Sequence, residues 1–135
     1  MAQKIEEIEG IGPVYGEKLS SNGIKTVEDL LEAGATRTGR SKLAEATGIS
    51  EKSILTWVNM ADLFRIKGIG PQFAELLEAA GVDTVKELRN RNAQNLHAKL
   101  VEVQAEKKIT RAVPGLSQVE DFIEQAKALP PKVTY

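Results

Sequence analysis

The chain has 135 residues, of which 41% are hydrophobic, enough for one compact domain or two small units that share a core. Its formal net charge of −1 favours neither a strongly basic nucleic-acid-binding protein nor a protein with an acidic tail. The absence of cysteine excludes disulfides and thiolate metal sites.

The sequence carries no signal for export or membrane insertion. Its first ten residues lack the basic start and apolar run of a signal peptide. No apolar run approaches the ~20 residues that a membrane-spanning helix needs. Together with the lack of cysteine, which suits a reducing cytosol, this predicts a cytoplasmic protein without a membrane partner.

Helix start signals recur along the first half, whereas strand signals are nearly absent, so an all-α fold is predicted. In the last helix of this half, Trp57 lies on an apolar stripe at helical spacing, which indicates a core residue rather than a platform for stacking bases. The expected helices are a short one that ends at Gly10, then 13–22, one capped by Thr26, 40–47, and 51–63 capped by Ser50.

The second half repeats this order of elements. Phe122 and Ile123 correspond to Trp57 and Val58 at an offset of 65 residues, so the second copy is longer by about one turn of helix or loop. The expected helices are 71–80, a short one capped by Thr84, 93–107, and a last one that Pro130 and Pro131 stop.

Each half is organised around a glycine turn. Gly68-Ile69-Gly70-Pro71 repeats Gly10-Ile11-Gly12-Pro13 at an offset of 58 residues. In both copies the glycines permit a sharp bend, the isoleucine can enter the core, and the proline suits the first position of a helix. The duplication predicts two repeats, 1–63 and 64–129, packed pseudo-symmetrically, with 130–135 as a tail.

These turns resemble the helix-hairpin-helix superfamily, in which a glycine turn is followed by a small residue and a leucine. Gly16 and Leu19 fill those places in the first copy, as Ala74 and Leu77 do in the second. The segment 23–31 is similar to part of the SAM-like C-terminal domain of the bacterial RNA polymerase α subunit. Nearly the whole chain resembles a bacterial family catalogued as domain of unknown function 4332.

The resemblance implies DNA binding without sequence preference, through backbone N–H groups that meet phosphate at a helix N-terminus. In some relatives the hairpin carbonyls also hold a monovalent cation; no other cofactor is implied. By this resemblance, the phosphate-facing residues are Lys67, Gly68, Ile69, Gly70 and Gln72 in the second turn, and Gly10, Ile11, Gly12 and Lys18 in the first.

The sequence departs from the binding pattern just after each turn. DNA-binding members usually place lysine or arginine there, but this chain has Val14 and Gln72. Lys67 before the second turn favours phosphate, whereas its counterpart Glu9 does not. The alternative for either turn is a purely structural bend whose glycines only permit the change of direction.

The distribution of charged residues favours the second half of the chain as the part that binds an anionic partner. Residues 1–62 contain seven lysines and arginines against ten acidic residues, a net charge of −3; residues 63–135 contain eleven against nine, a net charge of +2. A basic cluster of Lys107, Lys108 and Arg111 could support phosphate binding. Its alternative is a solvated helix end where cations complement the helix dipole.

No nucleophile–base set, phosphate-binding loop of the Walker type or metal-ligand cluster is visible, so we expect a non-enzymatic protein without a metal site. The leading hypothesis is weak, sequence-independent DNA binding by backbone–phosphate contacts. The alternative is a protein-interaction or self-assembly module that binds no nucleic acid, which the low net charge favours.

Overall fold

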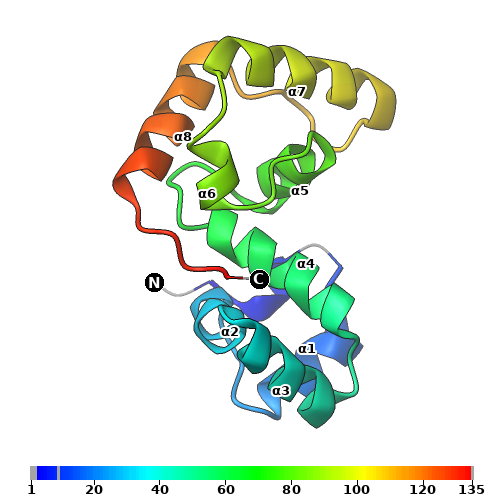
Figure 1. The fold of residues 1–135 in the computed structure, drawn as a ribbon. Coiled ribbons are helices and arrows are strands. Elements are labelled where there is room, and N and C mark those ends of the chain that lie inside the picture. Colours follow the sequence, from blue (N-terminus) through cyan, green and yellow to red (C-terminus); the bar gives the residue numbers. More distant parts are fainter. Residues whose placement is uncertain (1–2, 9, 135) are drawn as a thin grey trace. The chain divides into compact units, whose positions relative to one another are not determined.

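The computed structural model describes residues 3–8 and 10–134, and these residues are all-α, as predicted (Figure 1). The one extended pairing in the described ranges is an isolated bridge between Lys4 and Thr26. The elements are a 3₁₀-helix, η1 (Ile5–Glu7), and the α-helices α1 (Pro13–Ser20), α2 (Val27–Gly34), α3 (Arg37–Thr47), α4 (Glu51–Leu63), α5 (Pro71–Ala79), α6 (Val85–Leu88), α7 (Ala93–Lys107) and α8 (Leu116–Ala128).

The chain divides into two compact units. The first contains the described residues up to Asp62 together with 132–134, and the second runs from Leu63 to Pro131. Residues 132–134, which the sequence assigns to a tail, thus belong to the first unit. Lys132 is therefore counted with the first unit. Over the sequence, residues 1–62 and 132–135 contain eight basic and ten acidic residues, and residues 63–131 contain ten and nine. The net charges are therefore −2 and +1, a smaller contrast than that predicted for the two halves.

Threonine caps open the two short helices, as predicted. Thr26 Oγ1 accepts a hydrogen bond from the Asp29 N–H at 3.0 Å, and the Asp29 carboxylate accepts one from the Thr26 N–H at 3.1 Å. A hydrogen bond from the Lys25 backbone N–H is the largest of the contacts that lower the pKa of Asp29. Thr84 Oγ1 caps α6 in the same way. These side chains satisfy N–H groups that a helix start leaves without a partner.

Several helix boundaries differ from the prediction. α1 ends at Ser20 rather than at residue 22, and α5 ends at Ala79 rather than at residue 80. α3 begins at Arg37 rather than at residue 40, because Thr36 Oγ1 accepts from the Gly39 N–H at 3.0 Å and starts the helix earlier. The predicted opening helix is a single 3₁₀ turn over Ile5–Glu7. The predicted helix over 93–107 is confirmed at both ends.

The turn before α1 recurs before α5 with the same backbone geometry. Gly10 and Gly68 have φ angles of 96° and 97°. In the first turn the Ile11 N–H donates to the Ile8 C=O at 3.2 Å, and the corresponding bond 58 residues later has the same length. Such a positive φ is open to glycine, whereas a residue with a Cβ atom is disfavoured there by roughly 1–2 kcal/mol.

An aromatic side chain lies directly behind each of these glycines. A Cβ atom on Gly10 would be 3.2 Å from Trp57 Nε1, and one on Gly68 would be 3.0 Å from Phe122 Cε1. Trp57 is 6% exposed and Phe122 is 3% exposed. The prediction that Trp57 is a core residue is therefore confirmed, and the offset of 65 residues relates the two aromatic side chains behind the turns.

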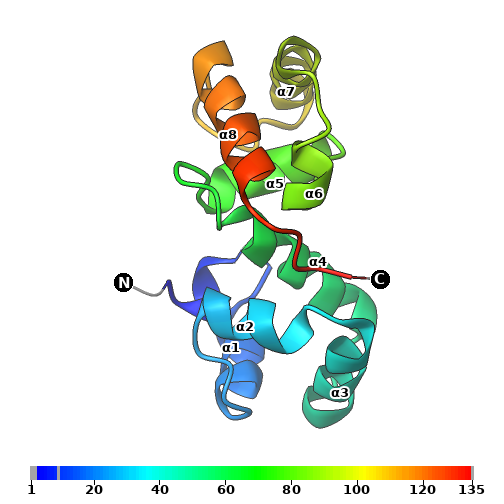
Figure 2. The same ribbon diagram turned by 60° about the vertical axis from the view of Figure 1, so that its left-hand side comes forward.

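Within each unit the helices pack against one another, and the glycines of both turns are exposed or half-buried. In the first unit, α2 packs against α3 and both α1 and α2 contact η1. In the second, α7 packs against α5 and α8, and α8 also covers α6 (Figure 2).

Across the described ranges, no helix is long and apolar enough to cross a bilayer.

Candidate functional site

The second glycine turn has three backbone N–H groups without an intramolecular partner. Among the described residues, no acceptor pairs with the N–H of Gly68, Gly70 or Gln72. Gly68 and Gln72 are exposed and Gly70 is half-buried. The last two lie at the N-terminus of α5, where unpaired N–H groups and the helix dipole favour a negative group. The arrangement can accept an oxygen of a phosphate or a carboxylate.

Two residues of the predicted set cannot offer their N–H groups to a phosphate. Ile69 is 4% exposed, and its N–H donates to the Ile66 C=O at 3.2 Å. The Lys67 N–H donates to Gln125 Oε1 at 2.8 Å. The available surface is thus smaller than predicted, and Lys67 contributes only its exposed ammonium group. Ile11 in the first turn is buried and bonded like Ile69.

Gln125 on α8 is the positioning residue that sequence reasoning missed. Its side-chain amide bonds both main-chain groups of Lys67, because Nε2 also donates to the Lys67 C=O at 3.1 Å. Asp121 Oδ2 accepts from the same Nε2 at 2.9 Å. At the offset of 65 residues the first unit has Met60, which cannot make these bonds. Gln125 therefore fixes the second turn in a way that is specific to that turn.

These bonds also bear on the predicted cation at a hairpin. In the second turn the Ile66 C=O accepts from a backbone N–H and the Lys67 C=O accepts from Gln125. Each of these oxygens has a second lone pair, so a cation held there would share the oxygen with a hydrogen bond. In the described ranges, no group of three or more aspartate, glutamate or histidine side chains is arranged to hold a metal ion.

The first turn has the same backbone but different surroundings. The N–H groups of Gly10 and Gly12 have no acceptor among the described residues, whereas Glu9 lies outside them. The next two side chains are apolar and exposed: Val14 is 67% exposed and Tyr15 is 42% exposed. The exposed acids on η1 add negative charge to this unit. The first turn therefore presents an apolar and acidic surface.

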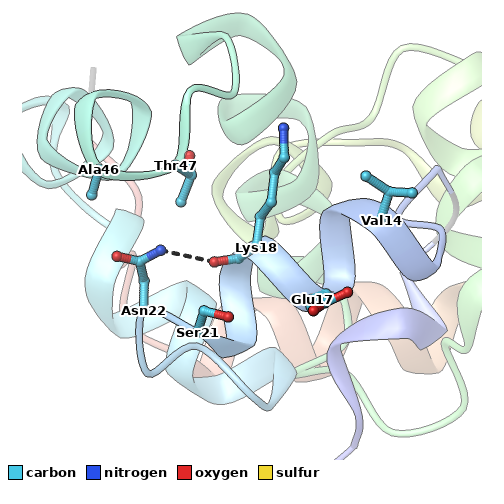
Figure 3. Close-up of a pocket in the computed structure, with 7 residues that line it drawn as sticks. All are labelled: Val14, Glu17, Lys18, Ser21, Asn22, Ala46 and Thr47. Atoms are coloured by element: carbon cyan, nitrogen blue, oxygen red, sulfur yellow. Dashed lines mark hydrogen bonds between the residues drawn. The ribbon is translucent and has the colours of Figure 1, made fainter.

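Lys18 lies in the last turn of α1, one helix length from the glycine turn that it was predicted to support. Its Nζ is 5.9 Å from the centre of the Tyr15 ring, a cation–π arrangement. Figure 3 shows its side chain extending away from Glu17. Together α1 and the end of α3 line a shallow groove of about 380 Å³, formed by Val14, Glu17, Lys18, Ser21, Asn22, Ala46 and Thr47.

The predicted supporting cluster is not gathered at the second turn. Lys107 ends α7, Lys108 follows it with a φ of 50°, and Arg111 lies in the next loop; all three are exposed. Figure 1 draws this end of α7 on the side of the second unit away from the loop between α4 and α5. Lys107 complements the dipole at the end of α7.

The pKa of the Glu78 carboxyl group on α5 is raised. Burial is the largest cause, and the charges of Asp83 and Glu75 add to it. Glu78 Oε2 is buried and has no hydrogen-bond partner in the described part of the chain. An ionised glutamate is therefore less stable here than in water.

We expect Glu78→Gln to stabilise the protein at neutral pH. A folded-state pKa above the ordinary 4.5 means that the stability contributed by protonated Glu78 is present at low pH and lost as pH rises through the folded pKa. The gain at pH 7 should not exceed about 1 kcal/mol, because the group is half-exposed and screened by solvent. Thermal unfolding of both proteins at pH 4 and pH 7 measures it. An equal difference at the two pH values would contradict the assignment.

Comparison with known proteins gives one match. The family model described as Domain of unknown function (DUF4332) matches residues 9–129, which is most of the chain. No curated protein and no solved structure matches the chain significantly.

Proposed function

Since the chain belongs to the DUF4332 family, whose description states no activity, we propose a function from the residues themselves: non-enzymatic, weak, sequence-independent DNA binding. The contact is made by the open N–H groups of the second glycine turn with one or two phosphates. The helix-hairpin-helix resemblance of the sequence supports the same proposal. Phosphate contacts of this kind position a protein on DNA and carry no sequence information.

The observation that carries the proposal is the open state of the Gly68 and Gly70 N–H groups beside an exposed lysine. Backbone N–H groups at a helix start bind a phosphate oxygen without needing many cations. The Lys67 ammonium adds one positive charge at the same turn. Asp121, which bonds Gln125, keeps a carboxylate on the adjoining helix and limits the affinity.

Fluorescence anisotropy with a labelled DNA duplex and a labelled single strand tests the proposal. With one or two phosphates neutralised, the plot of log K against log salt should have a slope of about −1 to −2. Binding should weaken severalfold between about 50 and 200 mM salt. No binding to either DNA at the lower salt concentration would remove the proposal.

Matched variants test whether DNA binds at the second turn. Lys67→Glu should weaken DNA binding by about three- to tenfold, whereas the same charge change at Lys99, an exposed residue of α7, should have a much smaller effect. Gln72→Lys places a cation where DNA-binding relatives have one and should strengthen binding. Val14→Lys makes the same change at the first turn and should add less, because the first unit has a net negative charge and carries the exposed acids of η1.

A second candidate function, protein interaction, is favoured by the first turn. Val14 and Tyr15 expose apolar surface at the position where the second turn has Gln72 and a half-buried phenylalanine. Single exposed apolar residues are common, but adjacent ones at a turn suit a protein contact. Val14→Ser combined with Tyr15→Ser should leave DNA binding unchanged; a loss of DNA binding would assign these residues to the DNA interface instead.

A further inference from the structure

The segment that follows α8 is bound by the first unit through its main chain. The Thr134 N–H donates to the Ala35 C=O at 2.8 Å, and the Thr134 C=O accepts from Arg40 Nη2 at 2.6 Å. Ala35 follows the last residue of α2, where helix carbonyls lack partners within the helix. One acceptor and one donor of the first unit therefore hold both main-chain groups of a single residue.

Of the two preceding residues, Val133 has a buried side chain and Lys132 forms an ion pair with the first unit. Val133 is 7% exposed. Lys132 Nζ lies 2.9 Å from Glu32 Oε1 on α2. The segment thus has a cation paired with α2, a buried apolar side chain, and a third residue whose main chain is held by the first unit. A peptide that adds its main chain to a receptor is commonly bound in this way, with hydrogen bonds for affinity and side-chain contacts for specificity.

Arg40 supplies this surface with a buried side chain that donates hydrogen bonds to main-chain carbonyl groups. It is 4% exposed, and its Nη1 donates to the Gly34 C=O at 2.9 Å. Arg40 is the fourth residue after the cap Thr36; in the second unit, the fourth residue after the cap Asn92 is Leu96, a core residue. A buried guanidinium is unfavourable without acceptors. The first unit therefore has a carbonyl-binding arginine at a position where the second has a leucine.

We propose that Glu32, Ala35 and Arg40 form a peptide-binding site, and that its ligand in trans is the segment 132–134 of a second copy of this chain. The segment occupies the site in cis, and an identical segment offers identical contacts. Pro130 and Pro131 precede it and favour an extended connector that can present the segment outward once it is released. Exchange of an identical element between copies is a low-cost route to a dimer.

The test uses the full chain with Val133→Asp, which empties the site by placing a charge in an apolar contact. The probe is a fluorescein-labelled peptide with the sequence of residues 129–135. The variant should bind this peptide at least about tenfold more tightly than the wild-type chain, whose own segment fills the site. A peptide with aspartate in place of valine should not bind. A folded Val133→Asp chain that does not bind the wild-type peptide would overturn the proposal.

Two further measurements keep the test decisive. Adding Glu32→Lys to the Val133→Asp chain should weaken peptide binding by about two- to fivefold, and a peptide with Lys132→Glu should recover it, since exposed ion pairs contribute up to about 1 kcal/mol. If Val133→Asp does not fold, Thr134→Pro replaces it, because proline removes the N–H donor of the segment. The Thr134→Pro chain should also bind the wild-type peptide at least about tenfold more tightly than the wild-type chain does. A folded Thr134→Pro chain that does not bind this peptide would overturn the proposal.

Sedimentation of the wild-type chain at rising concentration tests the second copy as the ligand. A dimer should appear and should be absent from the Val133→Asp chain. A wild-type chain that stays monomeric at concentrations where the peptide saturates the same wild-type chain would overturn the assignment of the ligand to a second copy, because both ligands must displace the segment bound in cis.

Discussion

Phe122→Ala is expected to lower the free energy of unfolding by about 3–5 kcal/mol, the range found when large buried aromatic residues are truncated. Phe122 belongs to the core of the second unit, and its ring centre lies 6.4 Å from that of Phe73 at a tilt of 58°. It also lies behind Gly68. Alanine would remove the aromatic contact and leave a cavity beneath the turn.

Denaturant unfolding followed by far-UV circular dichroism measures this loss, because Trp57, the one tryptophan, belongs to the first unit and its fluorescence reports there. Phe122→Leu keeps most of the volume and should lose less than about 1.5 kcal/mol. Leu116→Ala, at a residue that is 37% exposed, should stay within about 0.5 kcal/mol of wild type. If Phe122→Ala loses less stability than Phe122→Leu, the Phe122 ring does not make the stabilising contact assigned to it here.

Gly68→Ala is expected to destabilise the protein by about 2–3 kcal/mol. The φ of 97° disfavours a residue with a Cβ atom, and the new methyl group would be 3.0 Å from Phe122 Cε1. Since Phe122 is buried, its ring has little room to move away. The substitution also changes the direction of the Gly68 N–H, so DNA binding should weaken together with stability.

Gly70→Ala is the matched control for that substitution. Gly70 has a φ of −100°, and no atom lies within 4 Å of the position that its Cβ would take. Its substitution should change stability by only a few tenths of a kcal/mol, the usual difference between glycine and alanine at a helix cap. Chemical unfolding of the two variants under one set of conditions compares them; equal losses would show that backbone conformation at Gly68 is not the cause.

Local sequence signals were sufficient for most of the fold. Threonine caps, the proline after each glycine turn and apolar spacing identify helix starts because these effects act within one or two turns of helix. They failed where two local signals competed: the helix was expected to begin at residue 40, after Gly39, but the Thr36 cap starts α3 at Arg37. The all-α class and the helix over 93–107 follow from such local patterns.

Long-range contacts could not be predicted in this way. Gln125 binds the Lys67 backbone across 58 residues of sequence, and nothing in its local pattern distinguishes it from a solvated glutamine. Arg40, on a helix with several other polar residues, also gave no sign that it binds the Thr134 carbonyl. Contacts of this kind depend on which elements meet in the folded unit, and a single sequence does not encode that information in any one segment.

Backbone amide NMR during titration with a short DNA duplex tests the central claim most directly. The N–H signals of Gly68, Gly70 and Gln72 should shift progressively, and Lys67→Glu should reduce those shifts, while the signals of Gly10 and Gly12 should move much less. Shifts confined to the first turn, or unchanged Gly68 and Gly70 signals at saturating DNA, would contradict phosphate binding by the second turn.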